Sequence, residues 1–63
     1  MPLVNIKMMA GRDDDKKRRL VKKMTDVICE TLDCPADAVR ISIEDMPPEN
    51  YAIGGVLILD KQK

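Results

Sequence analysis

The chain begins with the stretch MPLVNIKMM, which decides the fold. Val4, Ile6 and Met8 recur at every second position, and a polar residue separates each of them from the next. Because side chains alternate between the two faces of a strand, this spacing predicts a strand over residues 3–9. The three apolar side chains are then expected on one face of that strand, toward the core.

A tight turn and a long helix are predicted to follow this strand. Gly11 interrupts the alternation and suits the turn. Asp13, Asp14 and Asp15 can accept hydrogen bonds from the free N–H groups of a first helical turn, which predicts a helix over residues 13–33. Its mainly apolar stripe follows the three- and four-residue spacing of one helical face. The stripe consists of Leu20, Val21, Met24, Val27, Ile28, Thr31 and Leu32.

A second strand completes a βαβ unit. Pro35 either ends the helix or begins a short turn that runs to Ala38. Residues 39–44, with the sequence VRISIE, then alternate between apolar and polar side chains, which predicts a strand with Arg40 on its polar face. A strand, a helix and a strand in this order predict parallel pairing and a right-handed crossover.

The C-terminal part predicts a small hairpin. Gly54-Gly55 separates the apolar residues 51–53 from residues 56–59, and two glycines suit a two-residue hairpin turn. The second arm is apolar on both faces, so we expect another subunit to cover it. The predicted fold class is therefore α/β (α+β): a short βαβ protomer with parallel strands plus a C-terminal β-hairpin, assembled as an oligomer.

Length and composition limit the classes to which the protein can belong. The chain has 63 residues, which predicts a single domain over residues 1–63 that depends on oligomerisation for stability. Its net charge is zero and Tyr51 is its one aromatic residue, which argues against a nucleic-acid partner. The basic run at residues 16–19 could be a nucleic-acid or localisation patch. We favour a solvated helical face paired with the preceding aspartates. No apolar run approaches the length of a membrane span.

The cysteines indicate neither a metal site nor a structural disulfide. The chain has no histidine, and Cys29 and Cys34 do not form a zinc-type pattern. On a single helix the two side chains would face different ways. We therefore expect reduced thiols and a cytoplasmic location.

Three residues could take part in a reaction: one that can carry a free amine and two arginines. Once Met1 is removed, as is normal before proline in the cytosol, Pro2 carries a free secondary amine held by a rigid ring. Nearby cations lower the pKa of an amine, so a prolyl amine close to Arg12 and Arg40 could act as a general base. The two guanidinium groups suit an anionic substrate. Tyr51 and Met9 could supply apolar walls. The alternative is that both arginines pair with surface acids.

The whole chain resembles the 4-oxalocrotonate tautomerase family of the tautomerase superfamily. The resemblance rests on a spaced set of motifs along the whole length. They are the Pro2 start, Gly11-Arg12, Leu32-Asp33-Cys34-Pro35, Val39-Arg40, Glu44-Asp45-Met46 and Tyr51-Ala52-Ile53-Gly54-Gly55. Membership implies a hexamer built as a trimer of dimers. It also implies a 1,3-keto–enol tautomerisation that needs no metal and no cofactor.

The resemblance also implies residue roles. Pro2 would move a proton between two carbons of a small anionic enol or keto acid. Arg40, from a neighbouring subunit, would bind the 2-oxo group and stabilise enolate charge, and Arg12 would hold a distal carboxylate across an interface. Tyr51 lies where the family commonly has phenylalanine, and Ala38 lies where a serine often contacts substrate. Met9 falls on an apolar wall position of the substrate site.

One alternative stays open at this point. The chain could instead be a non-catalytic or partner subunit of a hetero-oligomeric tautomerase assembly, which donates Arg40 or packing surface but no working base.

Overall fold

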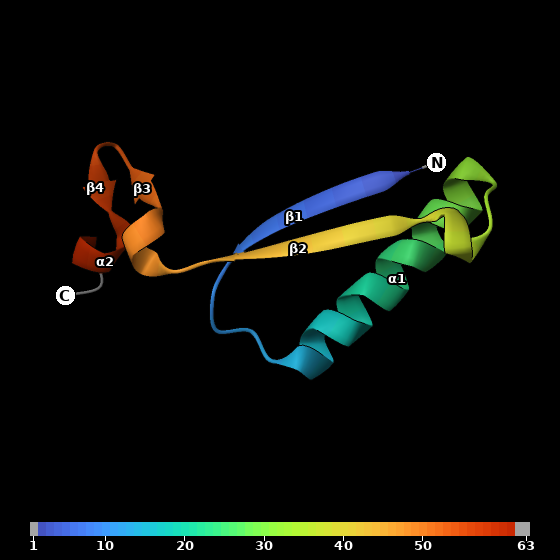
Figure 1. Cartoon of the computed structure of the whole chain (residues 1–63), viewed down its shortest axis with the longest axis horizontal. Helices are drawn as coiled ribbons and strands as arrows, with labels where there is room; N and C mark the ends of the chain where they lie inside the picture. The colour runs from blue at the N-terminus through green and yellow to red at the C-terminus, as the bar shows by residue number, and fades with distance from the viewer. Residues whose placement is uncertain (1, 62–63) are drawn as a thin grey trace.

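The structure is a computed structural model and describes residues 2–61. One long helix crosses a two-stranded sheet, and a small hairpin projects beyond the end of the sheet (Figure 1). The elements in chain order are β1 (Leu3–Met9), α1 (Asp14–Leu32), the short 3-10 turn η1 (Ala36–Ala38), β2 (Arg40–Met46), the short turn η2 (Pro48–Asn50), β3 (Ala52–Ile53), β4 (Val56–Leu57) and α2 (Ile58–Lys61).

The predicted βαβ unit is confirmed. β1 and β2 pair in parallel, in a register that sets Leu3 opposite Arg40 and Met9 opposite Met46. The alternating residues of both strands divide as expected, because Val4, Ile6 and Met8 of β1 and Ile41 and Ile43 of β2 are half-buried. The positions between them are exposed, as is Leu3 at the start of β1. On the exposed face the Asn5 side-chain amide donates a hydrogen bond to the Ser42 hydroxyl over 2.6 Å.

The ends of α1 follow from local chemistry. The Asp13 carboxylate accepts a hydrogen bond from the Lys16 backbone N–H over 2.7 Å, which caps the first turn. At the other end Asp33 adopts the left-handed conformation, with φ 59° and ψ 49°, and stops the helix. Lys17 joins the start of α1 to the end of β2 through a 2.7 Å ion pair with Asp45.

The apolar stripe of α1 is wider than the sheet that it covers. Leu20, Val21 and the other inward positions are half-buried against the sheet face that carries Met8 and Ile43. Val27 and Leu32, which the spacing also placed on the stripe, are each 60% exposed. A two-stranded sheet is too narrow to cover them, so this part of the stripe is open to a partner.

The hairpin is shorter than the sequence predicted. Gly54 and Gly55 take positive φ values of 62° and 85°, as a tight two-residue turn requires, and β3 pairs with β4 in an antiparallel ladder. The prediction that the second arm continues as a strand to Leu59 was wrong, because α2 begins at Ile58. The Ile58 N–H donates a hydrogen bond to the Tyr51 carbonyl over 2.8 Å and closes the hairpin. The chain then continues as the short helix α2.

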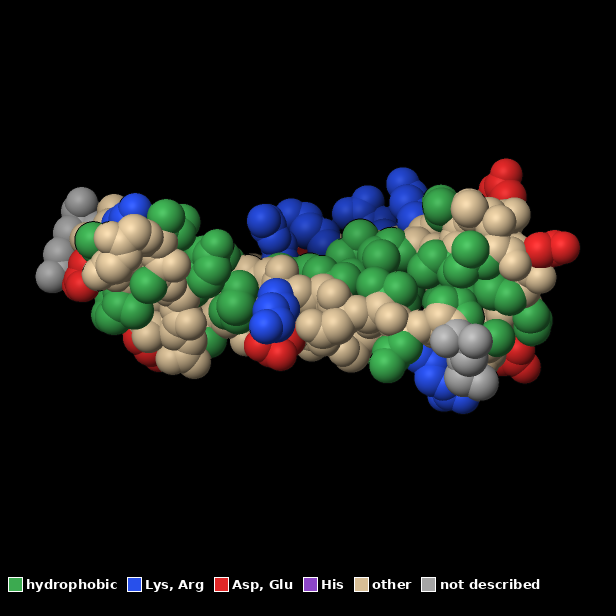
Figure 2. Space-filling view, turned by 90° about the horizontal axis from the view of Figure 1, so that it is seen from above, with side chains coloured by type: hydrophobic (Ala, Val, Ile, Leu, Met, Phe, Trp, Pro, Cys, Tyr) green, Lys and Arg blue, Asp and Glu red, His purple; other side chains and the backbone are tan. Residues whose placement is uncertain are grey.

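The protomer has no closed core. Among residues 2–61 no side chain is classed as buried, and large hydrophobic side chains remain open over both halves of the molecule (Figure 2). Its accessible surface is 4959 Å², against about 4,100 Å² for a compact monomer of this mass. Its radius of gyration is 15.1 Å, against about 11 Å for a compact chain of this length. This shape indicates a subunit that needs partners.

Replacing Asp13 with alanine is expected to lower the free energy of unfolding by about 1 kcal/mol, because the Lys16 N–H loses its acceptor. Urea unfolding followed by circular dichroism at one fixed protein concentration measures the change. Asp37→Ala is the matched control, since it removes a carboxylate from η1, where no side chain caps the turn. Equal unfolding midpoints for the two variants would contradict the role of Asp13.

Candidate active site

One group of the predicted site residues lies where both parallel strands begin. Pro2 directly precedes β1, and its carbonyl accepts a hydrogen bond from the Arg40 backbone N–H over 3.0 Å. Ala38 lies two residues before Arg40 in the chain, in η1, and is half-buried. The parallel register therefore brings the backbones of Pro2 and Arg40 together although 37 residues separate them in sequence.

The Arg40 side chain leaves the sheet on the face away from α1. Arg40, Ser42 and Glu44 are the exposed alternate residues of β2, while Ile41 and Ile43 face the helix side. The Arg40 side chain therefore lies on the exposed face of the sheet. The role of this side chain at the amine, and its origin in a neighbouring subunit, stay predictions.

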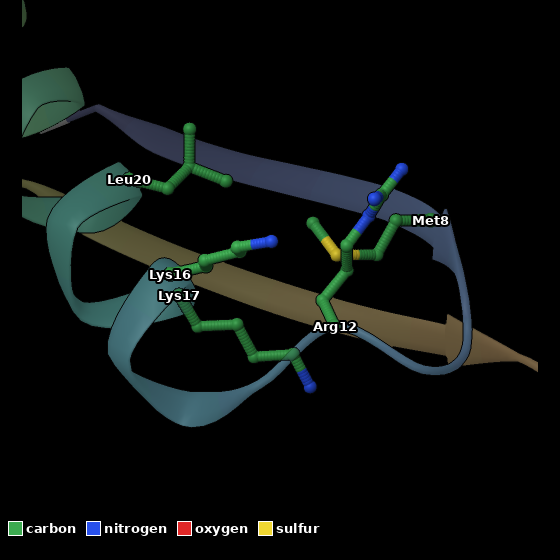
Figure 3. A pocket seen from close by; sticks show the side chains of 5 residues that line it. All are labelled: Met8, Arg12, Lys16, Lys17 and Leu20. Carbon is green, nitrogen blue, oxygen red and sulfur yellow. The ribbon is translucent and has the colours of Figure 1, made fainter.

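A second group lies at the opposite end of the sheet. Met9 ends β1, and Arg12 follows a turn in which Gly11 takes a φ of 116°. Arg12 lines a cavity of about 100 Å³ together with Met8, Lys16, Lys17 and Leu20. Figure 3 shows the Arg12 guanidinium reaching past the Met8 side chain, with Lys16 extending into the same space. The surface of the cavity is mainly apolar, and the cationic ends of Arg12 and Lys16 lie beside it. The Lys17 ammonium is already paired with Asp45.

Lys16 is a cavity residue that the sequence analysis did not single out. It was grouped with residues 16–19 as part of a solvated helical face. That interpretation holds for Arg18, which pairs with Asp15 over 2.7 Å on the exposed side. Lys17 instead pairs with Asp45 of β2. The available signal was helical spacing, because Lys16 lies one turn before the inward-facing Leu20.

Tyr51 also lies beyond the far end of β2, after η2. Its backbone carbonyl holds the hairpin closed, and the residue is 38% exposed. A seven-residue strand is about 23 Å long, so Tyr51 and Arg12 lie at the opposite end of the sheet from Pro2 in one protomer. A single chain therefore presents the predicted site as two half-sites: Pro2, Ala38 and Arg40 at one end of the sheet, and Met9, Arg12 and Tyr51 toward the other.

Two further features of residues 2–61 bear on the class of protein. No three histidine, cysteine, aspartate or glutamate side chains in this part of the chain gather in a way that could hold a metal ion. None of its helices combines the length and the apolar character that crossing a bilayer requires.

Comparison with known proteins supplies the family. Residues 2–61 match the Tautomerase family, described as tautomerase enzyme. A probable tautomerase from Bacillus cereus is 38% identical over 61 residues, which are 97% of this chain and 100% of that protein. The structure of YwhB, a homologue of 4-oxalocrotonate tautomerase, matches with a TM-score of 0.88 and 37% identity, over 94% of this chain and 97% of that one.

A third relative is a heterohexamer 4-oxalocrotonate tautomerase from Chloroflexus aurantiacus. It matches with a TM-score of 0.86 and 28% identity, over 95% of this chain and 97% of that one. The chain therefore belongs to the tautomerase family. Within that family its solved relatives are homologues of 4-oxalocrotonate tautomerase, as the sequence resemblance predicted.

Proposed function

We propose that the protein is a cofactor-independent isomerase that catalyses the 1,3-keto–enol tautomerisation of a small unsaturated 2-hydroxy or 2-keto acid. The general base is the amine of Pro2, freed when Met1 is removed in the cytoplasm; Met1 itself lies outside the described residues. One observation carries the proposal. In a chain of the tautomerase family, the residue that bears the amine directly precedes β1 and is hydrogen-bonded through its carbonyl to Arg40.

The proposed reaction moves one proton and no other group. The Pro2 nitrogen takes the proton from the 2-hydroxyl or from a carbon of the acid, and the protonated amine returns it to the other end of the conjugated system. Negative charge forms on the 2-oxygen during transfer. The Arg40 guanidinium of a neighbouring subunit binds this oxygen and the adjoining carboxylate, so the developing enolate meets a cation already in place.

The proposal requires an assembly that unites the two half-sites. The end of the sheet that carries Arg12 must approach the Pro2 end of another protomer, since the length of β1 separates them in one chain. The apolar surface for such contacts is supplied by the open stripe of α1, by the exposed hairpin and by α2. Ile53, Val56 and Leu57 of the hairpin and Leu59 of α2 are 37–51% exposed. We propose a homohexamer arranged as a trimer of dimers.

Turnover by protein with a verified N-terminus tests the function. Intact mass first shows that Met1 is absent, because an acylated Pro2 nitrogen cannot accept a proton. Ketonisation of phenylenolpyruvate, a monocarboxylate, and of 2-hydroxymuconate, a dicarboxylate, is then followed by absorbance. Turnover of either enol supports the proposal. Processed protein that turns over neither would favour a non-catalytic partner subunit, a class of assembly for which the Chloroflexus aurantiacus heterohexamer is a precedent.

Replacing Arg12 with alanine is expected to lower kcat/KM for the dicarboxylate by about 10- to 100-fold, since a charge-assisted bond to the distal carboxylate is lost. The monocarboxylate should lose less than about threefold, because it has no second carboxylate to bind. Steady-state kinetics on both substrates measures the difference. Arg19→Ala is the matched control, because it removes the same charge from an exposed position on α1. Equal losses on both substrates would contradict the assignment of Arg12.

A further inference from the structure

The C-terminal end of α1 brings the two cysteines together. Cys29 lies in the last full turn of the helix, and the left-handed residue Asp33 reverses the direction of the chain just after it. The N–H groups of Asp33 and Cys34 both donate to the Cys29 carbonyl, the latter over 3.3 Å. In this type of helix ending the side chains at these two positions are frequently in contact.

The two thiols lie close together, as this backbone geometry favours. Both are free and half-buried, and Cys34 is close enough to contribute to the raised pKa of the Cys29 thiol. The sequence analysis considered the case in which one helix carries both residues and the side chains diverge. The helix carries only Cys29, because it ends at Leu32. The left-handed Asp33 then turns Cys34 back onto it.

We propose that Cys29 and Cys34 form a reversible intrachain disulfide by exchange with a low-molecular-weight disulfide. In the first step the Cys34 thiolate attacks that disulfide, which forms a mixed disulfide and releases one thiol. In the second step the Cys29 thiolate attacks the Cys34 sulfur and releases the second thiol. Both cysteines are oxidised, the small disulfide is reduced to two thiols, and these carry away the two protons.

The order of the two steps follows from the surroundings of Cys29. Desolvation raises the pKa of the Cys29 thiol, and the adjacent Cys34 raises it further through its charge and its hydrogen bond. The thiolate is the attacking species, so Cys29 is disfavoured as the first attacker. Once Cys34 carries the mixed disulfide, the helix ending already holds Cys29 beside the residue whose sulfur it must attack.

Equilibration of the processed, assembled protein with oxidised and reduced glutathione tests the proposal. Alkylation under denaturing conditions and intact mass then count the free thiols. We expect the chain to lose two hydrogen atoms and both alkylation sites, with no retained glutathione and no linkage to a second chain. The equilibrium constant for disulfide formation by glutathione should be at least about tenfold larger for the folded protein than for the urea-unfolded chain, because the fold holds the two cysteines close together. Equal constants, retained glutathione or chain-to-chain linkage would overturn the proposal.

Single variants test the order of attack, with circular dichroism as the check on folding. Cys29→Ser is expected to accumulate the glutathione adduct on Cys34, since the resolving thiol is gone. Cys34→Ser should accumulate its adduct on Cys29 several-fold more slowly, because desolvation, the largest cause of the raised pKa, does not depend on Cys34 and still leaves less Cys29 thiolate. Cys29→Ala and Cys34→Ala repeat the comparison without a hydroxyl at either position. Equal or reversed rates would overturn the assignment of Cys34 as the first attacker.

Discussion

Replacing Pro2 with alanine is expected to lower kcat/KM for enol ketonisation by roughly 10²- to 10⁴-fold. Met1 before alanine is removed as it is before proline, so the variant still presents an amine. In alanine the amine can rotate about the N–Cα bond, whereas the pyrrolidine ring fixes the position of the proline nitrogen at the start of β1. Steady-state kinetics on both enol substrates measures the loss.

Packing and assembly should be unchanged in this variant. The backbone carbonyl of Pro2 accepts a hydrogen bond from the Arg40 N–H, and alanine has the same carbonyl. Size-exclusion chromatography and the unfolding midpoint therefore serve as controls. Native protein that retains Met1 is a second control, because its Pro2 nitrogen is an amide. Near-normal turnover by the processed alanine variant, or full turnover by the unprocessed native chain, would exclude Pro2 as the base.

The βαβ unit could be predicted from sequence because its signals are local. Val4, Ile6 and Met8 mark the strand through their alternation, and Asp13 marks the start of the helix through a capping bond to a residue three positions away. The hairpin turn was equally readable, since Gly54-Gly55 takes positive φ values. Each of these features depends on side chains close together in the chain.

Two features could not be predicted from the sequence, because they depend on local backbone conformation that the pattern of apolar and polar residues does not encode. Ile58 and Leu59 are apolar and look like a continuing strand. The Ile58 N–H still donates to the Tyr51 carbonyl in the register of the ladder, but the backbone turns into α2 from Ile58 onward. Cys34 meets Cys29 only because Asp33 adopts the left-handed conformation. Spacing alone does not distinguish that turn from one more helical residue.

For the candidate site, the residues could be predicted from the sequence, but the proximity of Pro2 and Arg40 could not. The sequence could nominate Pro2 and Arg40 by their chemistry, but their proximity depends on the register that sets Leu3 opposite Arg40. A shift of two residues would keep every apolar side chain facing α1 and would separate the pair. Arg12 could also be nominated, and its separation from Pro2 in one protomer follows from the predicted strand over residues 3–9, which the structure contains as β1.

Replacing Arg40 with alanine is expected to lower kcat by roughly 10²- to 10³-fold, the effect of removing one preorganised donor to a developing oxyanion. The fold should tolerate the change, because the side chain is exposed and the backbone bond to Pro2 remains. Arg40→Lys should recover only part of the rate, since an ammonium group cannot bind the 2-oxygen and the carboxylate in a bidentate manner. A loss confined to the unfolding midpoint would count against the catalytic role.

Mixing two inactive variants decides whether Arg40 acts within its own chain or across an interface. If Arg40 serves a neighbour, a co-refolded mixture of Pro2→Ala and Arg40→Ala chains contains some sites with the native Pro2 of one chain and the native Arg40 of another. Turnover should then rise well above that of either variant alone. If Arg40 serves its own chain, every site in the mixture lacks one of the two groups and turnover stays low. The outward path of the Arg40 side chain, on the face away from α1, leads us to expect recovery.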